Sequence, residues 1–212
     1  MEIEFFFDCS SPWTYLAFLK LQVLAAEFRA DIVWRPILVG GIFNAVNPGV
    51  EYQKRLEVDP PAKMAYYLKD LSDWIRAEGV ALKFPPPGHP VNSVKAMRAC
   101  LVLQGEGLLV PWARAVFQAY FGAGLDISDD IVLSQLCASV NVDSDWLLGR
   151  IADPQIKQQL RDNVEEAIRR GAFGTPTMYL DKDDMYFGVD RLQLLRLAME
   201  RSRAHTRGTS NL

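Results

Sequence analysis

The chain has 212 residues, of which 50% are hydrophobic and 23% charged, and its formal net charge is −3 at pH 7. This composition indicates a globular protein, and it lacks the basic stripe that would neutralise nucleic-acid phosphates. No apolar run reaches the roughly 18 residues of a membrane span. The start "MEIEFFFD" does not have the pattern of a signal peptide, so none is expected there. Three scattered cysteines with two histidines favour a cytoplasmic protein without bound metal.

The first forty residues predict a strand, a helix and a second strand. Residues 2–8 are rich in phenylalanine, which suits a central strand buried on both faces. Ser11 is a preferred helix N-cap and Pro12 is tolerated at the first helical position, so a helix begins there and runs to about Phe28. A second strand begins near Asp31. The three elements predict a right-handed βαβ unit.

The middle of the chain predicts a long helical block. The stretch "GGIFNAVNPGVEYQKRLEVDPPAK" has several glycines and prolines and is predicted to be a loop or boundary. Helical periodicity then runs from Met64 to Gly149, broken by the rigid connection "FPPPGHP", and Gly79 is a candidate C-terminal cap. The segment "DPQIKQQLRDNVEEAIRRG" adds a last helix to the block.

Strands return near the C-terminus. "TPTMYLD" and "MYFGV" predict a hairpin around "KDD", and "DRLQLLRLAMERSR" predicts a final helix with Asp190 as its N-cap, followed by a frayed polar tail. We therefore predict an α/β protein with a thioredoxin-like fold and a large all-helical insertion. The thioredoxin-like domain would comprise residues 1–39 and 169–212, and the insertion residues 40–168.

The corner "DCSSPWTYL" is the first candidate site. It resembles the "CPWCY" corner of DsbA-like oxidoreductases, with Ser11 in place of the first redox cysteine and Thr14 in place of the second. Cys9 lies two residues before the corner, so no redox disulfide can form there. The helix N-terminus still favours an anion, such as the thiolate of a bound molecule, and glutathione is the abundant candidate. The plainer interpretation is that Ser11 is a helix cap and nothing more.

Three further residues each have a structural and a functional interpretation. Pro176, two residues after Gly174 at the start of a strand, is either an ordinary strand-edge proline or, as we predict, part of a cis Thr175–Pro176 bond that faces the helix start. Asp190 is either a plain helix cap or a partner for the ammonium of a γ-glutamyl group. Lys63, near a helix start, is either solvated or paired with a ligand carboxylate.

Together these stretches resemble the family of 2-hydroxychromene-2-carboxylate isomerases and kappa-class glutathione transferases. The motifs occur in the family's order along nearly the whole chain: the "SP" corner, "GGIFNAVN", "PAK", "PVNSVKAMRA", "GAFGTP" and "FGVDR". The resemblance implies that Ser11 holds the glutathione sulfur and that Lys63 meets the glycine carboxylate. It also implies that the backbone of Thr175, before Pro176, pairs with the cysteinyl unit, and that Asp190 meets the γ-glutamyl end.

This sequence departs from the family pattern at two places. The family usually has Ser or Asn before the acidic residue, where this chain has Val189. Since a valine side chain forms no hydrogen bond, we expect this chain to lack one hydrogen bond to the ligand that the family pattern implies. The family's "GN" after the loop reads here as "VNPG", with Asn47 as the candidate ligand contact.

The resemblance implies a glutathione-dependent isomerase acting on a small aromatic carboxylate. The substrate would be 2-hydroxychromene-2-carboxylate, converted to trans-o-hydroxybenzylidenepyruvate in bacterial aromatic catabolism, and the protein would be a homodimer. Trp13, Phe43 and the helical block are candidates for an apolar substrate pocket. Two alternatives stay open: a kappa-like glutathione transferase, and a redox-inactive thioredoxin-like binding or chaperone module that needs no glutathione.

Overall fold

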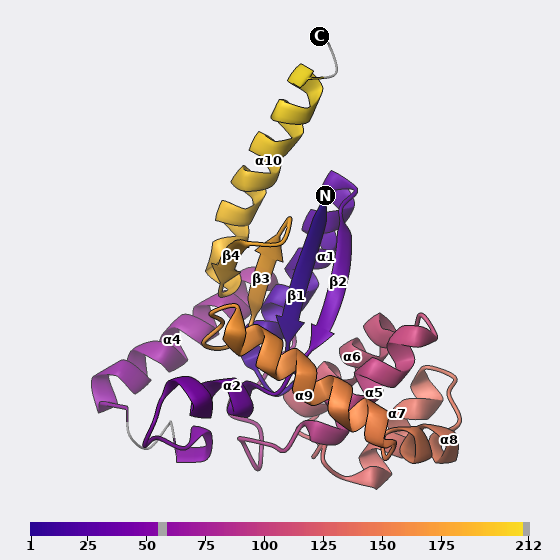
Figure 1. Ribbon diagram of the computed structural model, residues 1–212. Helices are drawn as coiled ribbons and strands as arrows, with labels where there is room; N and C mark the ends of the chain where they lie inside the picture. The colour runs from indigo at the N-terminus through magenta and orange to yellow at the C-terminus, as the bar shows by residue number, and fades with distance from the viewer. Residues whose placement is uncertain (55–58, 210–212) are drawn as a thin grey trace.

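A four-stranded mixed sheet forms the centre of the molecule in the computed structural model, which describes residues 1–54 and 59–209. The strand order is β2-β1-β3-β4. β1 (Glu2–Phe7) and β2 (Asp31–Pro36) are parallel and joined by α1 (Pro12–Phe28), as the sequence predicted. β3 (Thr177–Leu180) and β4 (Asp184–Phe187) form the predicted antiparallel hairpin, and β3 pairs with β1 (Figure 1).

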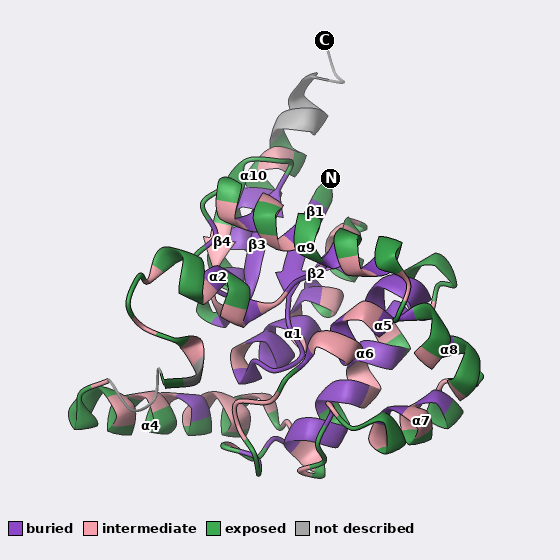
Figure 2. Cartoon of the chain, turned by 60° about the horizontal axis from the view of Figure 1, so that its bottom comes forward, coloured by how far each residue is buried: buried purple, intermediate pink, exposed green. Residues whose placement is uncertain are grey.

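Both faces of β1 are covered, which explains its run of phenylalanines. Phe5 and Phe7 belong to the main core with residues of α1 and α10 (Leu192–Thr209). Phe6 points the other way and packs with residues of α2 (Val39–Val46) and α9 (Pro154–Arg169). Successive side chains of a strand alternate between faces, so a strand covered on both sides is apolar at successive positions. β1 is accordingly buried from Ile3 to Phe7, and Figure 2 colours the chain by this burial.

The helical block lies between β2 and β3, and the fold is therefore thioredoxin-like with a helical insertion. Besides α2 and α9, the block contains α4 (Pro61–Glu78), α5 (Val94–Gly105), α6 (Leu109–Phe117), a π-helical turn (Gln118–Gly122), α7 (Asp130–Ser139) and α8 (Ser144–Arg150). Gly79 ends α4 in the left-handed conformation, as predicted. Ala167 of α9 packs against Phe6 of the sheet, and the limits 40–168 for a separate insertion domain stay a prediction.

The predicted loop after β2 is wrong in its first half. Residues Val39–Val46 form α2, and a 3-10 turn covers Tyr52–Lys54. The glycine pair serves close packing here: a Cβ on Gly41 would lie 3.2 Å from Val164 of α9, and one on Gly40 would lie 3.5 Å from the Tyr52 ring. Residues 55–58 of the predicted loop lie outside the described residues.

The start of the last helix also differs from the prediction. Asp190 lies inside a 3-10 turn, Val189–Arg191, and α10 begins only at Leu192, so Asp190 is not the N-cap of that helix. The cause is Gly188, whose φ of 96° turns the chain sharply after β4. L side chains rarely adopt this φ, so the turn favours glycine.

The end of α10 differs as well, because the helix continues to Thr209 through the polar segment that was predicted to fray. No helix among the described residues combines the length and the apolarity of a membrane span. No group of three or more His, Cys, Asp or Glu side chains among them is arranged to hold a metal ion.

Candidate functional site

A cavity of about 900 Å³ lies where the start of α1 meets α4, α2, the loop before β3 and the turn after β4. Side chains far apart in the sequence meet there because β1 and β3 are neighbours in the sheet. The six site residues predicted from the sequence all line this cavity: Ser11, Asn47, Lys63, Thr175, Pro176 and Asp190. Their roles toward a ligand stay predictions.

Ser11 is the N-cap of α1 and is almost fully buried. Its hydroxyl oxygen accepts the backbone N–H of Thr14 at 3.3 Å, and Pro12 occupies the first helical position. The first turn of α1 has no acidic residue, so no side chain within that turn offsets the partial positive charge of the helix end. The Ser11 O–H and this helix end together can stabilise an anion at the cavity floor.

Thr14 and Thr175 join the helix start to the loop before β3. The Thr175 hydroxyl donates to the carbonyl oxygen of Phe6 at 3.1 Å. Its oxygen lies 3.0 Å from the Thr14 hydroxyl, which must therefore be the donor of that bond. Thr14, at the position of the second redox cysteine, is thus committed to a structural bond. The Thr175–Pro176 peptide is cis, as predicted, and β3 begins only at Thr177.

Asp8 is a residue of this corner that the sequence reading missed. One carboxylate oxygen accepts the N–H of Ser10 at 2.9 Å, and the other accepts the N–H of Val39 at 2.8 Å. Burial raises the pKa of Asp8 above its ordinary value, while these hydrogen bonds oppose the rise. Asp8 therefore ties the corner to the start of α2. A charged residue directly after the three phenylalanines at the end of the strand was the available signal.

Cys9 is not a reactive thiol. Its side chain is fully buried, and its backbone N–H points to the sulfur of Met97 at 3.3 Å. Burial raises the pKa of Cys9 well above its ordinary value, and the neighbouring thiol of Cys100 raises it further. Since the thiolate is the reactive form, the corner has no redox-active sulfur of its own.

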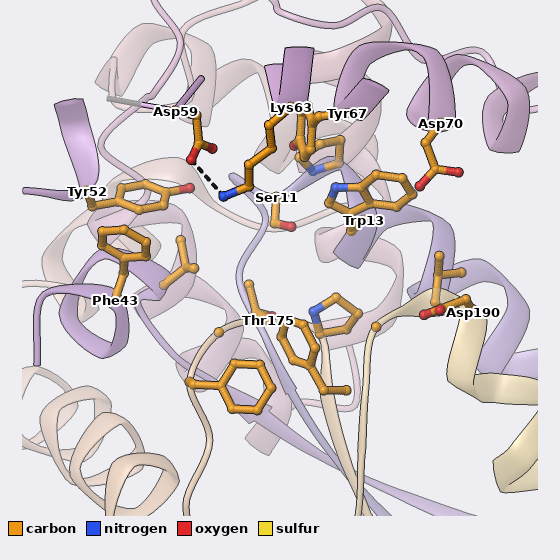
Figure 3. A pocket seen from close by; sticks show the side chains of 18 of the residues that line it. Ser11, Trp13, Phe43, Tyr52, Asp59, Lys63, Tyr67, Asp70, Thr175 and Asp190 are labelled. Carbon is orange, nitrogen blue, oxygen red and sulfur yellow. Dashed lines mark hydrogen bonds and ion pairs between the residues drawn. The ribbon is translucent and has the colours of Figure 1, made fainter. Parts of the chain in front are cut away.

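The charged residues lie at the rim of the cavity, on either side of Ser11 (Figure 3). Lys63, in the first turn of α4, pairs with Asp59 at 2.7 Å. Asp190 pairs with the adjacent Arg191. Asn47 ends α2, and its side-chain amide donates to the Phe43 carbonyl at 2.9 Å. The rim therefore presents the Lys63–Asp59 ion pair at one end and the carboxylates of Asp70 and Asp190 at the other.

Three aromatic pairs supply the apolar walls. Their ring centroids are 5.7 Å apart in Trp13–Tyr67, 5.6 Å in Phe43–Tyr52 and 4.3 Å in Phe173–Phe187. Each pair joins two different segments of the chain, and all six side chains line the cavity. Trp13, Phe43 and residues of the helical block line this cavity, and their role toward a substrate stays a prediction. Such walls suit a flat, apolar ligand beside the anion site.

The contribution of α4 is larger than the sequence reading expected. Lys63, Tyr67, Asp70 and Trp74 recur at intervals of three or four and all line the cavity. This spacing places them on one face of the helix. This face mixes charged and aromatic residues, whereas a helix face that packs in the core is apolar. The mixture was therefore a signal in the sequence that this face of α4 lines a site.

Comparisons with known proteins agree with this geometry. Residues 2–200 match the family model of the DSBA-like thioredoxin domain. The chain is 31% identical to 2-hydroxychromene-2-carboxylate isomerase from Sphingobium xenophagum, over 91% of this chain and 95% of that protein. It is 28% identical to glutathione S-transferase kappa 1 from Homo sapiens, over 91% and 88% of the two chains. A solved structure of a 2-hydroxychromene-2-carboxylate isomerase superposes with a TM-score of 0.86 at 25% identity, covering 99% of both chains.

Proposed function

Because the chain belongs to the DsbA-like thioredoxin family, in its group of 2-hydroxychromene-2-carboxylate isomerases and kappa-class glutathione transferases, we propose that it is a glutathione-dependent isomerase. The observation that carries the proposal is the corner without a redox thiol. A buried serine hydroxyl caps a helix N-terminus at the floor of a cavity with a cation and a carboxylate at its two ends. A glutathione thiolate fits that floor, and the charged ends of the tripeptide fit that rim.

The proposed reaction is reversible nucleophilic addition. In the ring-opened form of the chromene, reached when the ring C–O bond of the hemiketal breaks and the hemiketal hydroxyl proton moves to the phenolate oxygen, the glutathione thiolate would add to the alkene carbon β to the new ketone, and the electron pair of the double bond would move to the ketone oxygen. The former double bond is now single and rotates. The electron pair then returns, the carbon–sulfur bond breaks, and glutathione leaves unchanged. This is covalent catalysis by a bound nucleophile.

Each predicted site residue has a task in this scheme. Ser11 donates its O–H to the sulfur, and the backbone of Thr175 beside Pro176 pairs with the cysteinyl unit. Lys63 binds the glycine carboxylate and Asp190 the γ-glutamyl ammonium. Asn47 has the weakest case for a ligand contact, because its side-chain amide already donates a hydrogen bond to the Phe43 carbonyl oxygen. The aromatic pairs hold a flat substrate, for which we propose 2-hydroxychromene-2-carboxylate.

The test is a spectrophotometric assay of chromene-carboxylate isomerisation with and without glutathione. The proposal expects turnover that requires glutathione, with glutathione recovered unchanged. Turnover at the same rate without glutathione would contradict it, and so would failure of the protein to be retained on a glutathione resin. The second result would favour the redox-inactive binding or chaperone module.

A kappa-like glutathione transferase is the second candidate, because relatives of comparable identity are named as such. The same thiolate site would serve both activities. The difference lies in the fate of the adduct, which a transferase releases and an isomerase breaks down. Mass spectrometry of the products distinguishes the two. A homodimer, a cytoplasmic location and a role in aromatic catabolism stay predictions with this proposal.

A further inference from the structure

Asp70 is a half-buried acidic residue of α4 that lines the cavity. The other two acidic residues of this helix, Asp73 and Glu78, are held in ion pairs by cationic side chains. Within residues 1–54 and 59–209, the Asp70 carboxylate forms neither an ion pair nor a hydrogen bond with another residue. Its charge is therefore available to a ligand in the cavity.

Lys63 and Asp70 lie on the same face of α4, two turns apart. Positions that differ by seven along a helix of about 3.6 residues per turn point in nearly the same direction, and they are about 10 Å apart along the helix axis. Three fully extended residues span at most about 10–11 Å. One helix face therefore carries a cation and a carboxylate at the separation of the two charged ends of an extended tripeptide.

Asp70 and Asp190 lie at the same end of the cavity, opposite the Lys63–Asp59 ion pair (Figure 3). They belong to separate segments, because Asp190 is in the turn after β4. Asp190 also pairs with Arg191, so its oxygens are shared with a guanidinium. An ammonium group has three N–H donors. A second carboxylate at this end supplies acceptors for which Arg191 does not compete.

We propose that Asp70 is a specificity-determining residue, which binds the γ-glutamyl ammonium of glutathione together with Asp190. The helix α4 then contacts both charged ends of the tripeptide, through Lys63 and Asp70. This inference rests on the proposed glutathione site and adds a second carboxylate to it.

The two carboxylates select among thiol compounds by charge. A ligand with an ammonium at this end forms attractive contacts with both of them. A ligand that lacks the ammonium leaves two carboxylates facing its own negative charges, and like charges close together disfavour binding. The site therefore accepts the complete tripeptide and rejects an analogue without the amino group.

The first test measures glutathione binding by isothermal titration calorimetry, so it does not depend on turnover. Asp70→Asn keeps the size of the side chain and removes its charge, and glutathione affinity should fall about tenfold. Removing a negative charge would otherwise favour this anionic tripeptide, so a loss of affinity identifies a specific contact.

The matched control is Asp73→Asn. Asp73 is on the same helix and pairs with Lys69 and Arg76 instead of lining the cavity, so this variant should bind glutathione like wild type. Wild-type affinity in Asp70→Asn, or an equal loss in Asp73→Asn, would overturn the role of Asp70.

The second test changes the ligand to des-amino glutathione, in which hydrogen replaces the γ-glutamyl ammonium. Wild type should bind this probe more than about tenfold more weakly than glutathione, because both carboxylate contacts are lost. Asp70→Asn should bind the probe at least as tightly as wild type does. Lys63→Met should weaken the binding of both ligands, since both have the glycine carboxylate.

The outcomes separate this inference from the proposed function. An Asp70→Asn protein that loses affinity equally for glutathione and for des-amino glutathione would overturn the role of Asp70 and leave the proposed function standing. A wild-type protein that binds neither ligand would overturn both.

Discussion

The floor and the rim of the cavity are built in different ways. At the floor, Ser11, Thr14 and Thr175 are 6%, 0% and 7% exposed, and hydrogen bonds link Thr14 to both of the others. At the rim, the Lys63 and Asp190 side chains are 68% and 51% exposed. Within the part of the chain that the structure describes, each of these two side chains forms an ion pair only with a residue close to it in the sequence.

This difference separates a preorganised part of the site from an adaptable part. A buried network has one arrangement, because leaving any member unpaired costs about 1–3 kcal/mol. Exposed ion pairs are worth only ~0–1 kcal/mol, so a ligand carboxylate can replace Asp59 at Lys63 with little loss. We infer that the floor sets the chemistry of the sulfur, whereas the rim selects the tripeptide by its charged ends.

Removing the Ser11 hydroxyl should have the largest effect on catalysis. Ser11→Ala leaves the helix and loop in place but removes the donor to the thiolate, which typically costs ~2.7–4 kcal/mol in the transition state. We expect kcat of the isomerisation to fall by about 10²–10³-fold. Ser11→Thr, which keeps a hydroxyl and a good cap, is the control. An Ala variant as active as wild type would remove Ser11 from the chemistry.

Changes at the rim should act on glutathione affinity and much less on kcat. Lys63→Met removes one charge, and Asp190→Asn removes the other with little change in shape. Each should weaken binding by more than ~1 kcal/mol, because the ligand partly desolvates the contact, but by less than the ~3 kcal/mol of a fully buried pair. Isothermal titration calorimetry checks both. Wild-type affinity in both variants would show that the ligand lies elsewhere.

The bond between Thr14 and Thr175 should contribute to stability. Thr14→Val is nearly isosteric and removes the donor, and we expect a loss of about 1 kcal/mol in the free energy of unfolding. Thr14→Ser keeps the hydroxyl and is the matched control. Denaturant titration of both variants measures the difference. The network would have no energetic role if Val were as stable as wild type while Ser were not.

The buried carboxyl of Asp8 should give the smallest effect, visible as a pH dependence. Its pKa is raised in the folded protein, so its contribution to stability is fully present below about 3.9, where the unfolded carboxyl ionises. That contribution is lost as pH rises through the folded pKa, because the unfolded chain releases its proton first. Measuring the free energy of unfolding of wild type and Asp8→Asn from acidic to neutral pH isolates the contribution of the Asp8 carboxyl to stability. A wild-type-minus-variant difference that does not fall with rising pH would contradict the account.

The sequence predicted what local chemistry determines. The βαβ unit, the hairpin and the Ser11 cap follow from strand patterns and capping preferences. The resemblance to known motifs singled out six candidate residues, and all six line one cavity in the structure. The errors came from tertiary packing. Gly40 and Gly41 looked like loop residues because their close contacts with Tyr52 and Val164 are distant in sequence.

Other features of the site were outside the reach of sequence patterns. The turn at Gly188, which keeps Asp190 out of α10, depends on a positive φ that a sequence pattern does not specify. The tie between Asp8 and Val39 joins residues 31 positions apart. The pairing of His89 with Tyr120 crosses the helical block, again over 31 positions.

The central claim is that this corner holds the thiolate of bound glutathione. The most direct measurement is a pH titration of thiolate ultraviolet absorbance for glutathione bound to the wild type and to Ser11→Ala. Ser11 and the α1 terminus should lower the pKa of the bound thiol below the ~8.5 of a free cysteine thiol, and the Ala variant should move it back toward that value. A bound thiol that titrates like free glutathione in the wild type, or identically in the two proteins, would contradict the account.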